Sequence, residues 1–429
     1  MLDLKFIRDN ADLVQENCRK RNVNVDVSEV VGLYDSRNHV LAELESLRSR
    51  RNENARAMKA SPSDEQRTRL IEEGKSLKKQ IPELEQKLSQ TDQELTSKAF
   101  EIPNMTHPDA PVGRDDEDNR ELRQWGTPRS FEFTPRDHVE LASLLDLVDF
   151  NTAAKVSGTK FYYLRNQAVF LELALNRLAM DVLSDYGFTP MITPDIAREE
   201  VVTGIGFQPR GEESNIYTLE GGEGCLIGTA EITLGGYHRD QVLTGSDLPI
   251  RYAGLSHCFR REAGAAGRFS KGLYRVHQFT KVEMFVYCRP EESEATLDRL
   301  LAIEEEIVQK LELPYRVVDT CTGDLGGPAY RKFDIEAWMP GRGEHGDWGE
   351  ITSTSNCTDF QARRLGTRYR DNGKPALVHM LNGTAIANSR ALVSILENGQ
   401  QEDGSVRIPA ALAHYCGFDT IPVPAAGSE

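Results

Sequence analysis

The chain has 429 residues and a mass of 48.1 kDa, with 39% hydrophobic and 28% charged residues. These values indicate a globular protein of two or three domains and exclude collagen-like, low-complexity and membrane-spanning chains, since no apolar run approaches the roughly 18 residues of a spanning helix. The net charge of −16 argues against a protein that binds nucleic acid over its whole surface. The first 100 residues, however, hold 18 basic and 18 acidic side chains, so the rest of the chain carries the entire net charge.

The seven cysteines contain no C-x-x-C pair and are odd in number. They therefore indicate reduced thiols and neither a disulfide framework nor a zinc site, and no zinc is expected. The first six residues, MLDLKF, lack both the basic and apolar regions of a signal peptide and the composition of an organellar presequence. We expect a cytoplasmic protein or a matured organellar one, with no membrane partner.

Two long helices are predicted at the N-terminus. Residues 27–59 place leucine and valine at three- and four-residue steps, which is the pattern of a coiled-coil helix. Ser61 to Asp64 breaks this helix, and Ser63 or Asp64 is a suitable N-cap for a second one. The second helix continues the apolar stripe, and Pro82 should kink it or mark a new start. Residues 1–102 are thus predicted to form an antiparallel two-helix arm about 50 Å long.

The turn of this arm is basic in an acidic protein. Between residues 48 and 79 ten Lys and Arg side chains face five acidic ones. A solvated coiled-coil face is one interpretation of this charge. The other is a contact with the phosphate backbone of folded RNA, which basic side chains neutralise without reading bases. The candidate RNA-binding residues are Arg48, Arg51, Arg56, Lys75 and Lys78.

The remaining chain is predicted to hold a linker at 103–135, a main domain at 136–417 and a loose tail at 418–429. The linker, which we expect to include the entry strand of the main domain, is rich in Pro, Asp and Gly, without a sustained period. A helix over 161–186 leads into a Pro-stiffened strand at 187–194. Short strands follow, with helices near 291–312 and 384–398.

Residues 251–287 alternate as two strands joined by a glycine-rich loop at 264–272. Side chains two apart share a strand face, so cations, carboxylates and an aromatic ring gather on one side. That set suits ATP, with Arg260 on a phosphate, Glu262 on the adenine amino group and Phe279 stacked on the base. Taken alone, an R-x-E pattern on a strand is more often a surface ion pair.

Three further clusters carry candidate chemistry. Glu350 and Ser353 offer oxygen ligands for a magnesium ion on the phosphates, although a strand with a polar face is the simpler interpretation. Arg390 is the single cation of an apolar helical stretch, where a structural carboxylate or the terminal phosphates of a nucleotide would be its partner. Glu231 and Glu283 could hold a substrate ammonium between two carboxylates. Walker A and HExxH patterns are absent.

In this order along the chain, the signals resemble the seryl-tRNA synthetase family of class II aminoacyl-tRNA synthetases. The helix that ends at Gly187-Phe188, with the strand to Pro194, resembles class II motif 1. Phe259 through Phe279 is similar to motif 2 and Gly383 through Arg390 to motif 3, while Thr229-Ala230-Glu231 is similar to the serine-binding T-A-E of this family. The resemblance implies an α+β fold, in which a coiled-coil tRNA-binding arm precedes an antiparallel β-sheet catalytic domain flanked by helices.

The resemblance also implies roles for residues. Arg260 and Arg390 would be catalytic through the phosphates, and Glu350 and Ser353 would serve Mg²⁺. The residues implied to bind serine are Thr229, Ala230, Glu231, Glu283 and Thr384. Those implied to bind ATP are Arg260, Arg261, Glu262, Phe279, Glu350, Ile351, Thr352, Ser353 and Arg390.

The activity implied is the ATP-dependent attachment of L-serine to tRNA(Ser) through a seryl-adenylate, by a homodimer, with selenocysteine tRNA as a second candidate acceptor. Thr384 and the Asn388-Ser389 pair differ from the usual family pattern. Two alternatives are a noncatalytic synthetase-like tRNA-binding protein and an amino acid:carrier-protein ligase. The ATP and serine ligands count against the first, and the basic arm counts against the second.

Overall fold

The computed structural model describes residues 1–429 except 61, 210–213, 223, 264–269 and 426–429. The chain divides into two compact units, Met1–Met105 and Thr106–Glu429. Over the ranges described, none of the helices combines the length and the apolar character needed to cross a membrane.

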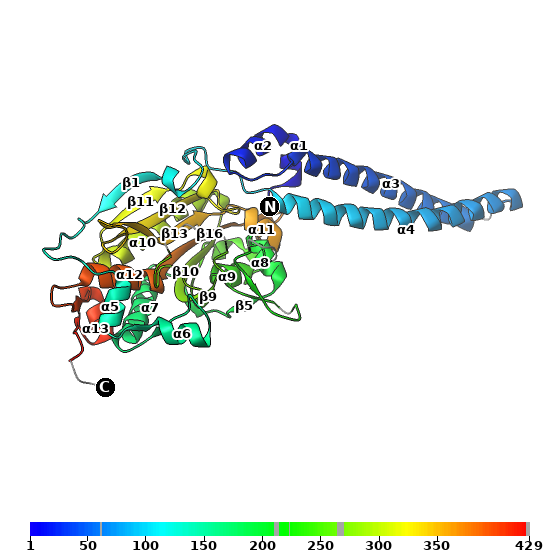
Figure 1. The fold of residues 1–429 in the computed structure, drawn as a ribbon. Helices are drawn as coiled ribbons and strands as arrows, with labels where there is room; N and C mark the ends of the chain where they lie inside the picture. Colours follow the sequence, from blue (N-terminus) through cyan, green and yellow to red (C-terminus); the bar gives the residue numbers. More distant parts are fainter. Residues whose placement is uncertain (61, 210–213, 223, 264–269, 426–429) are drawn as a thin grey trace. The chain divides into compact units, whose positions relative to one another are not determined.

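The first unit is the predicted two-helix arm with two short helices before it (Figure 1). Helix α3 spans Val27–Lys59, as predicted, and pairs along its length with α4, Asp64–Glu101. Leu44 and Leu47 of α3 pack on Leu77 and Ile81 of α4 in a buried seam. The apolar stripe seen in the sequence is therefore the surface that joins the two helices.

Helix α4 starts and continues in ways the sequence only partly indicates. Ser63 is the N-cap and forms a capping box with Gln66. The helix runs through Pro82, so of the two predicted alternatives, a kink or a new start, the new start is wrong. Proline removes one hydrogen bond, but Leu77 and Ile81 are buried against α3 and hold the turn that precedes it.

Helices α1, Leu4–Asp9, and α2, Ala11–Lys20, were not predicted, because six to ten residues are too few for a clear period. Asp3 caps α1 by accepting from the amides of Lys5 and Phe6. Buried Asn17 and Arg21 both donate to the carbonyl oxygen of Asn104, which fastens α2 to the end of the unit.

The second unit is built on an eight-stranded sheet that is antiparallel except where β4 runs parallel to β9, which confirms the predicted class of fold. In spatial order its strands are β1 Arg120–Trp125, β11 Tyr315–Asp319, β12 Arg331–Met339, β13 Asp347–Asn356, β16 His379–Ala387, β10 Gln278–Cys288, β9 Ile250–Phe259 and β4 Thr189–Ile192. The smaller pairings join β2 Val148–Asp149 with β3 Tyr163–Leu164, β5 Ile196–Ala197 and β6 Tyr217–Thr218 with β7 Cys225–Leu226, and β8 Val242–Thr244 and β15 Ala376–Leu377 with β14 Arg368–Arg370.

Helices cover both faces of this sheet (Figure 1). The strand β10 sorts its side chains by parity: Val282, Met284 and Val286 enter the larger core, whereas Phe285 and Tyr287 enter a smaller one. The helices that contribute to the larger core are α5 His138–Leu144, α7 Gln167–Asp185, α10 Ser293–Lys310, α12 Asn388–Gly399 and α13 Ala410–Cys416. Those of the smaller core are α8 Glu199–Ile205, α9 Glu231–Gly236 and α11 Phe360–Leu365, and α6 Phe150–Val156 lies before β3.

Several predicted boundaries are corrected. The helix expected over 161–186 begins at Gln167, because Tyr163–Leu164 pairs with β2. The helix expected near 384–398 begins at Asn388, because β16 pairs with β10 up to Ala387. The entry strand expected within the linker is Arg120–Trp125, strand β1 of the main sheet.

The prediction of a loose tail from residue 418 is wrong for β18, Thr420–Ile421. It pairs with β17, Val406–Arg407, and buries Ile421 completely. The last four residues of that tail, 426–429, and residues 264–269 of the loop expected at 264–272 lie outside the described residues.

Candidate active site

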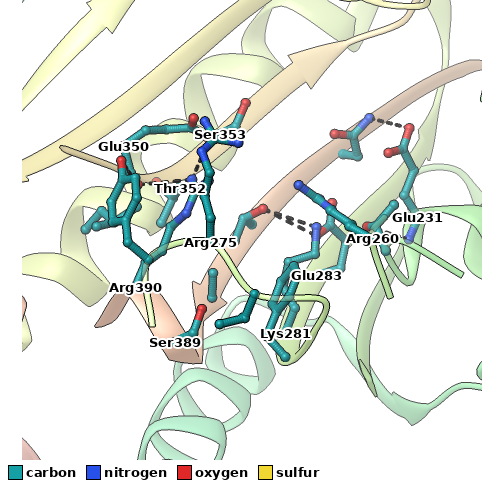
Figure 2. A pocket seen from close by; sticks show the side chains of 18 of the residues that line it. Glu231, Arg260, Arg275, Lys281, Glu283, Glu350, Thr352, Ser353, Ser389 and Arg390 are labelled. Carbon is teal, nitrogen blue, oxygen red and sulfur yellow. Dashed lines mark hydrogen bonds and ion pairs between the residues drawn. The ribbon is translucent and has the colours of Figure 1, made fainter. Parts of the chain in front are cut away.

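A cavity of about 240 Å³ lies on the sheet face to which the odd-numbered residues of β10 point. Phe279, Lys281 and Glu283 line it from β10, and the strands β13 and β16 and the start of α12 complete it (Figure 2). The antiparallel pairing of β10 with β16 sets Glu283 opposite Thr384. Parts of the chain more than 150 residues apart thus meet in one pocket.

Most residues predicted for serine and ATP line this cavity. They are Thr229, Glu231, Arg260, Glu262, Phe279, Glu283, Glu350, Ile351, Thr352, Ser353, Thr384 and Arg390. Two predicted residues do not line it. Ala230 is fully buried at the start of α9, and Arg261 is exposed, because neighbours in an extended chain point to opposite sides.

One end of the pocket gathers two carboxylates with a lysine and a threonine. Lys281 forms a buried ion pair with Glu283, and Thr384 Oγ1 lies 3.4 Å from both Lys281 Nζ and Glu283 Oε2. Glu231 Oε1 accepts from Gln361 at 2.8 Å and from Asn382 at 2.9 Å. This end can hold a small molecule that carries an ammonium and a hydroxyl group.

Burial raises the pKa of both carboxylates, and different neighbours oppose the rise. Burial, with repulsion from Glu283, raises the pKa of Glu231 to about 7, against the hydrogen bond from Gln361. Burial also raises the pKa of Glu283, although Lys281 opposes the shift. A cationic ligand that entered here would stabilise both charged forms.

The other end of the pocket is built on an arginine–carboxylate pair. Arg390 donates to the Glu350 side chain and to its carbonyl oxygen, both at 3.0 Å. Burial raises the pKa of Glu350, but Arg390, Lys332 and Arg260 outweigh it and hold that pKa at about 2. The partner of Arg390 is thus a carboxylate, one of the two predicted kinds, and that carboxylate is itself a candidate ligand for Mg²⁺.

Arg260 and Glu262, the residues predicted for the α-phosphate and adenine, line the same pocket. The Arg260 guanidinium lies 5.3 Å from the centre of the Phe279 ring, and its Nε donates to the Gly228 carbonyl at 3.2 Å. Glu262, with φ of +50°, accepts from Arg275 at 3.0 Å. The R-x-E pattern is therefore not a surface ion pair, since the Glu262 side chain is 11% exposed and lines the cavity.

Sequence reasoning assigned no role to several residues that line the pocket. Two of them carried a usable signal: Lys281 and Asn382 stand two positions before Glu283 and Thr384 and so share their strand faces. Others, among them Phe207 and Tyr274, lie in loops with no local signal. Gln361 reaches Glu231 from α11, which only the tertiary fold brings near.

In the first unit, the predicted RNA-binding residues lie on the outer faces of α3 and α4. Arg51, Arg56, Lys75 and Lys78 are exposed. Arg48 donates to Glu85 across the two helices at 2.7 Å, so part of its charge is already matched. The exposed four remain available to an anionic partner.

Comparison with protein families covers both units. Residues 1–106 match the seryl-tRNA synthetase N-terminal domain, and residues 217–399 match the tRNA synthetase class II core domain (G, H, P, S and T). The chain is 57% identical over 422 residues to the serine–tRNA ligase of Treponema denticola, covering 98% of this chain and 100% of that one. It is 55% identical to that of Rubrobacter xylanophilus, over 98% and 99% of the two chains.

Solved structures of similar proteins indicate the same family as the sequence comparisons. Seryl-tRNA synthetase from Pyrococcus horikoshii, complexed with ATP, superposes with a TM-score of 0.92 at 45% identity over 99% of this chain and 100% of that one. The cytoplasmic serine–tRNA ligase of Naegleria fowleri, in complex with AMP, gives 0.87 at 30% identity over 99% of both. The chain therefore belongs to the seryl-tRNA synthetase family of class II aminoacyl-tRNA synthetases, the serine–tRNA ligases.

Proposed function

We propose that this protein attaches L-serine to tRNA(Ser) in two steps through a seryl-adenylate. The observation that carries the proposal is one pocket with two carboxylates and a threonine at one end and the cations Arg260 and Arg390 beyond them. Relatives named serine–tRNA ligase, and a neighbouring structure complexed with ATP, support the same substrates. Selenocysteine tRNA is a second acceptor in this proposal.

In the first step the serine carboxylate attacks the α-phosphorus of ATP and pyrophosphate leaves. The carboxylate is already an anion at neutral pH, so no protein base is needed. Arg260 would neutralise charge that develops on the α-phosphate, and Arg390 would receive the departing phosphates. Catalysis here consists of positioning and electrostatic stabilisation.

In the second step a ribose hydroxyl at the end of the tRNA attacks the seryl carbonyl, and AMP leaves. Glu231, Glu283 and Thr384 hold the seryl group meanwhile. A pocket that bonds the serine hydroxyl rejects alanine, because buried polar groups would be left unpaired. Threonine differs by one methyl group, which only the rigidity of the walls can exclude.

Glu350 and Ser353 fit a magnesium ion that arrives with ATP. Both present hard oxygen donors, and the low pKa of Glu350 keeps its carboxylate charged. Such an ion would supply neutralising charge on the phosphates. Glu350 would then share its charge between the metal ion and Arg390.

A homodimer and a cytoplasmic location are also part of the proposal. An exposed apolar surface supports the dimer: Ile192 on the edge strand β4 is 85% exposed, and Phe170 and Leu173 on α7 are more than half exposed. The seven cysteines are all free thiols, which supports a reducing compartment.

The test of the proposed function is ATP–pyrophosphate exchange against a panel of amino acids, followed by charging of total tRNA. We expect exchange with serine alone and charging of tRNA with serine. Exchange without charging would favour a carrier-protein ligase. A lack of exchange with every amino acid would favour the noncatalytic tRNA-binding protein.

Serine binding should depend on pH through Glu231. Burial and Glu283 raise its pKa to about 7, so the carboxyl group is largely protonated at pH 6 and ionised at pH 8. The serine ammonium favours the ionised form, and serine therefore binds more tightly as pH rises. We expect the KM for serine, measured by exchange at saturating ATP, to fall about tenfold between pH 6 and pH 8. A flat profile, with the KM for ATP measured as control, would contradict this.

Glu350→Gln should weaken the use of magnesium. The amide removes the charge that balances Arg390 and offers a poorer oxygen ligand. We expect the Mg²⁺ concentration for half-maximal exchange to rise about tenfold, as one charged ligand is removed. Asp347→Asn, at the exposed start of the same strand, is the matched control. An equal response of both variants would remove Glu350 from this role.

A further inference from the structure

A buried histidine–glutamate pair lies outside the cavity, where α5, α12 and residues 271–273 meet. His138, at the start of α5, and Glu397, near the end of α12, have side chains only 1% and 2% exposed. His138 Nδ1 lies 2.8 Å from Glu397 Oε1, and the His138 amide donates to the same oxygen at 3.0 Å. The second carboxylate oxygen accepts from the amide of Gly341 at 2.8 Å.

The other ring nitrogen of His138 contacts residues 271–273, which precede strand β10. Nε2 lies 3.2 Å from the Lys271 carbonyl oxygen and accepts from the Leu273 amide at 3.2 Å. The Glu397 carboxylate can only accept, so His138 Nδ1 carries the ring proton and donates it to Glu397. Nε2 is then the acceptor. Next to His138, Asp137 caps α5 and forms an ion pair with Lys271. Two consecutive residues therefore hold residues 271–273.

Two glycines make this close approach possible. Gly272 has φ of +55°, and a Cβ there would lie 2.3 Å from His138 Nε2. A Cβ on Gly341 would lie 2.6 Å from the Asp137 Cα and 2.8 Å from Glu397 Oε1. Larger side chains at either position would separate the ring or the carboxylate from its backbone partners.

The segment held in this way leads directly into the phosphate end of the pocket. Tyr274 donates from its hydroxyl to the Glu350 carbonyl at 3.3 Å, and its ring lies 5.0 Å from the Arg390 guanidinium. Arg275 pairs with Glu262. A shift of Leu273 would move Tyr274 and Arg275, because these are its next neighbours in the chain. Through them it would reach Arg390 and Glu262.

We propose that His138, oriented by Glu397, is a positioning residue for ATP: it fixes the backbone at residues 271–273 and thereby the Tyr274 and Arg275 side chains of the phosphate end. The inference rests on the proposed function, because it assigns this end of the pocket to ATP. The side chains of the serine end, Glu231, Glu283 and Thr384, come from α9, β10 and β16, outside the segments that the pair joins.

Two amide substitutions of His138 distinguish the contribution of Nδ1 from that of Nε2. In His138→Asn the amide stands near the former Nδ1 and can still bond Glu397, but it does not reach residues 271–273. In His138→Gln the longer side chain can reach them. We expect His138→Asn to raise the KM for ATP in exchange about tenfold, the effect of removing one hydrogen bond with some displacement. His138→Gln should restore most of this, and the KM for serine should stay within about twofold of wild type in both.

His345→Asn, in an exposed loop, is the control for loss of an imidazole. Equal KM values for ATP in wild type and His138→Asn would overturn the proposal. So would an equal loss of kcat in the Asn and Gln variants with unchanged KM, which is the result of a purely structural role. If His138→Asn does not fold, Glu397→Gln replaces it, since the amide keeps the length of the side chain but removes the charge that orients the ring. About a threefold rise in the KM for ATP is then expected, and no rise would overturn the proposal.

Titration calorimetry with ATP and the same variants keeps the two proposals separate. A wild-type protein without exchange activity would count against the proposed function alone. The ratio of ATP affinities between wild type and His138→Asn reports on the pair in either case, and equal affinities would overturn the inference.

Discussion

Replacing Arg260 by alanine should reduce serine-dependent ATP–pyrophosphate exchange by about a hundredfold to a thousandfold, the usual effect of removing one charge-stabilising donor. Arg260 faces Phe279 and lines the pocket. Its charge opposes the burial that raises the pKa of Glu231 and Glu283, and it helps to lower the pKa of Glu350. Its loss should therefore weaken both serine binding and charge neutralisation at the α-phosphate.

The neighbouring Arg261→Ala is the matched control for Arg260→Ala. Arg261 carries the same charge one residue away but is exposed and does not line the cavity. We expect exchange by this variant to stay within about threefold of wild type. Arg260→Lys should recover little, because a point charge cannot replace a planar fork. Exchange retained by Arg260→Ala, or lost equally by Arg261→Ala, would refute the assigned role.

Deleting residues 35–95 should abolish tRNA charging, lowering it about a thousandfold or more, while serine-dependent exchange persists. The pocket lies wholly in the second unit, so adenylate formation does not need the arm. The cut ends can be joined by a short glycine linker, because Glu29 of α3 and Lys98 of α4 form an ion pair at 3.2 Å close to them. Loss of both activities would mean that the arm is needed for the fold of the protein.

A milder variant tests the charge of the arm while its helices remain. Substituting Arg51, Arg56, Lys75 and Lys78 by glutamine removes four exposed cations and leaves the buried leucine seam intact. The KM for tRNA should rise, and its dependence on salt should become less steep by about one power of concentration for each phosphate that the arm no longer neutralises. An unchanged salt dependence would favour the solvated coiled-coil face.

The sequence predicted the arm well because its helices are long and strongly periodic. Val27–Lys59 has the expected bounds, and Ser63 is one of the two expected caps. Boundaries failed where tertiary pairing overrides local pattern. Residues 384–387 resemble a helix start in small and apolar composition, yet they belong to β16 because it pairs with β10 up to Ala387. A local pattern contains no information about such partners.

The candidate site was predictable where alternation on one strand brings side chains together. Phe279 and Glu283 share a face of β10, and this follows from a period of two. The same period predicts Lys281 between them, but the ion pair that it forms with Glu283 follows only from the packed pocket. Gln361 and Tyr274 come from elements whose approach depends on the whole fold, and the resemblance to a family supplied no role for them.

The order of elements along the chain affects how the protein folds during synthesis. The α3–α4 seam near the turn joins residues close in sequence, and such local pairings form quickly. Strand β1, by contrast, pairs with β11 nearly 200 residues later, and β10 acquires its neighbour β16 only after about 90 more residues. A ribosome that adds about 5 to 20 residues per second therefore exposes a finished arm well before the sheet can close. During that interval the unpaired strands of the second unit are the part of the nascent chain most open to wrong association.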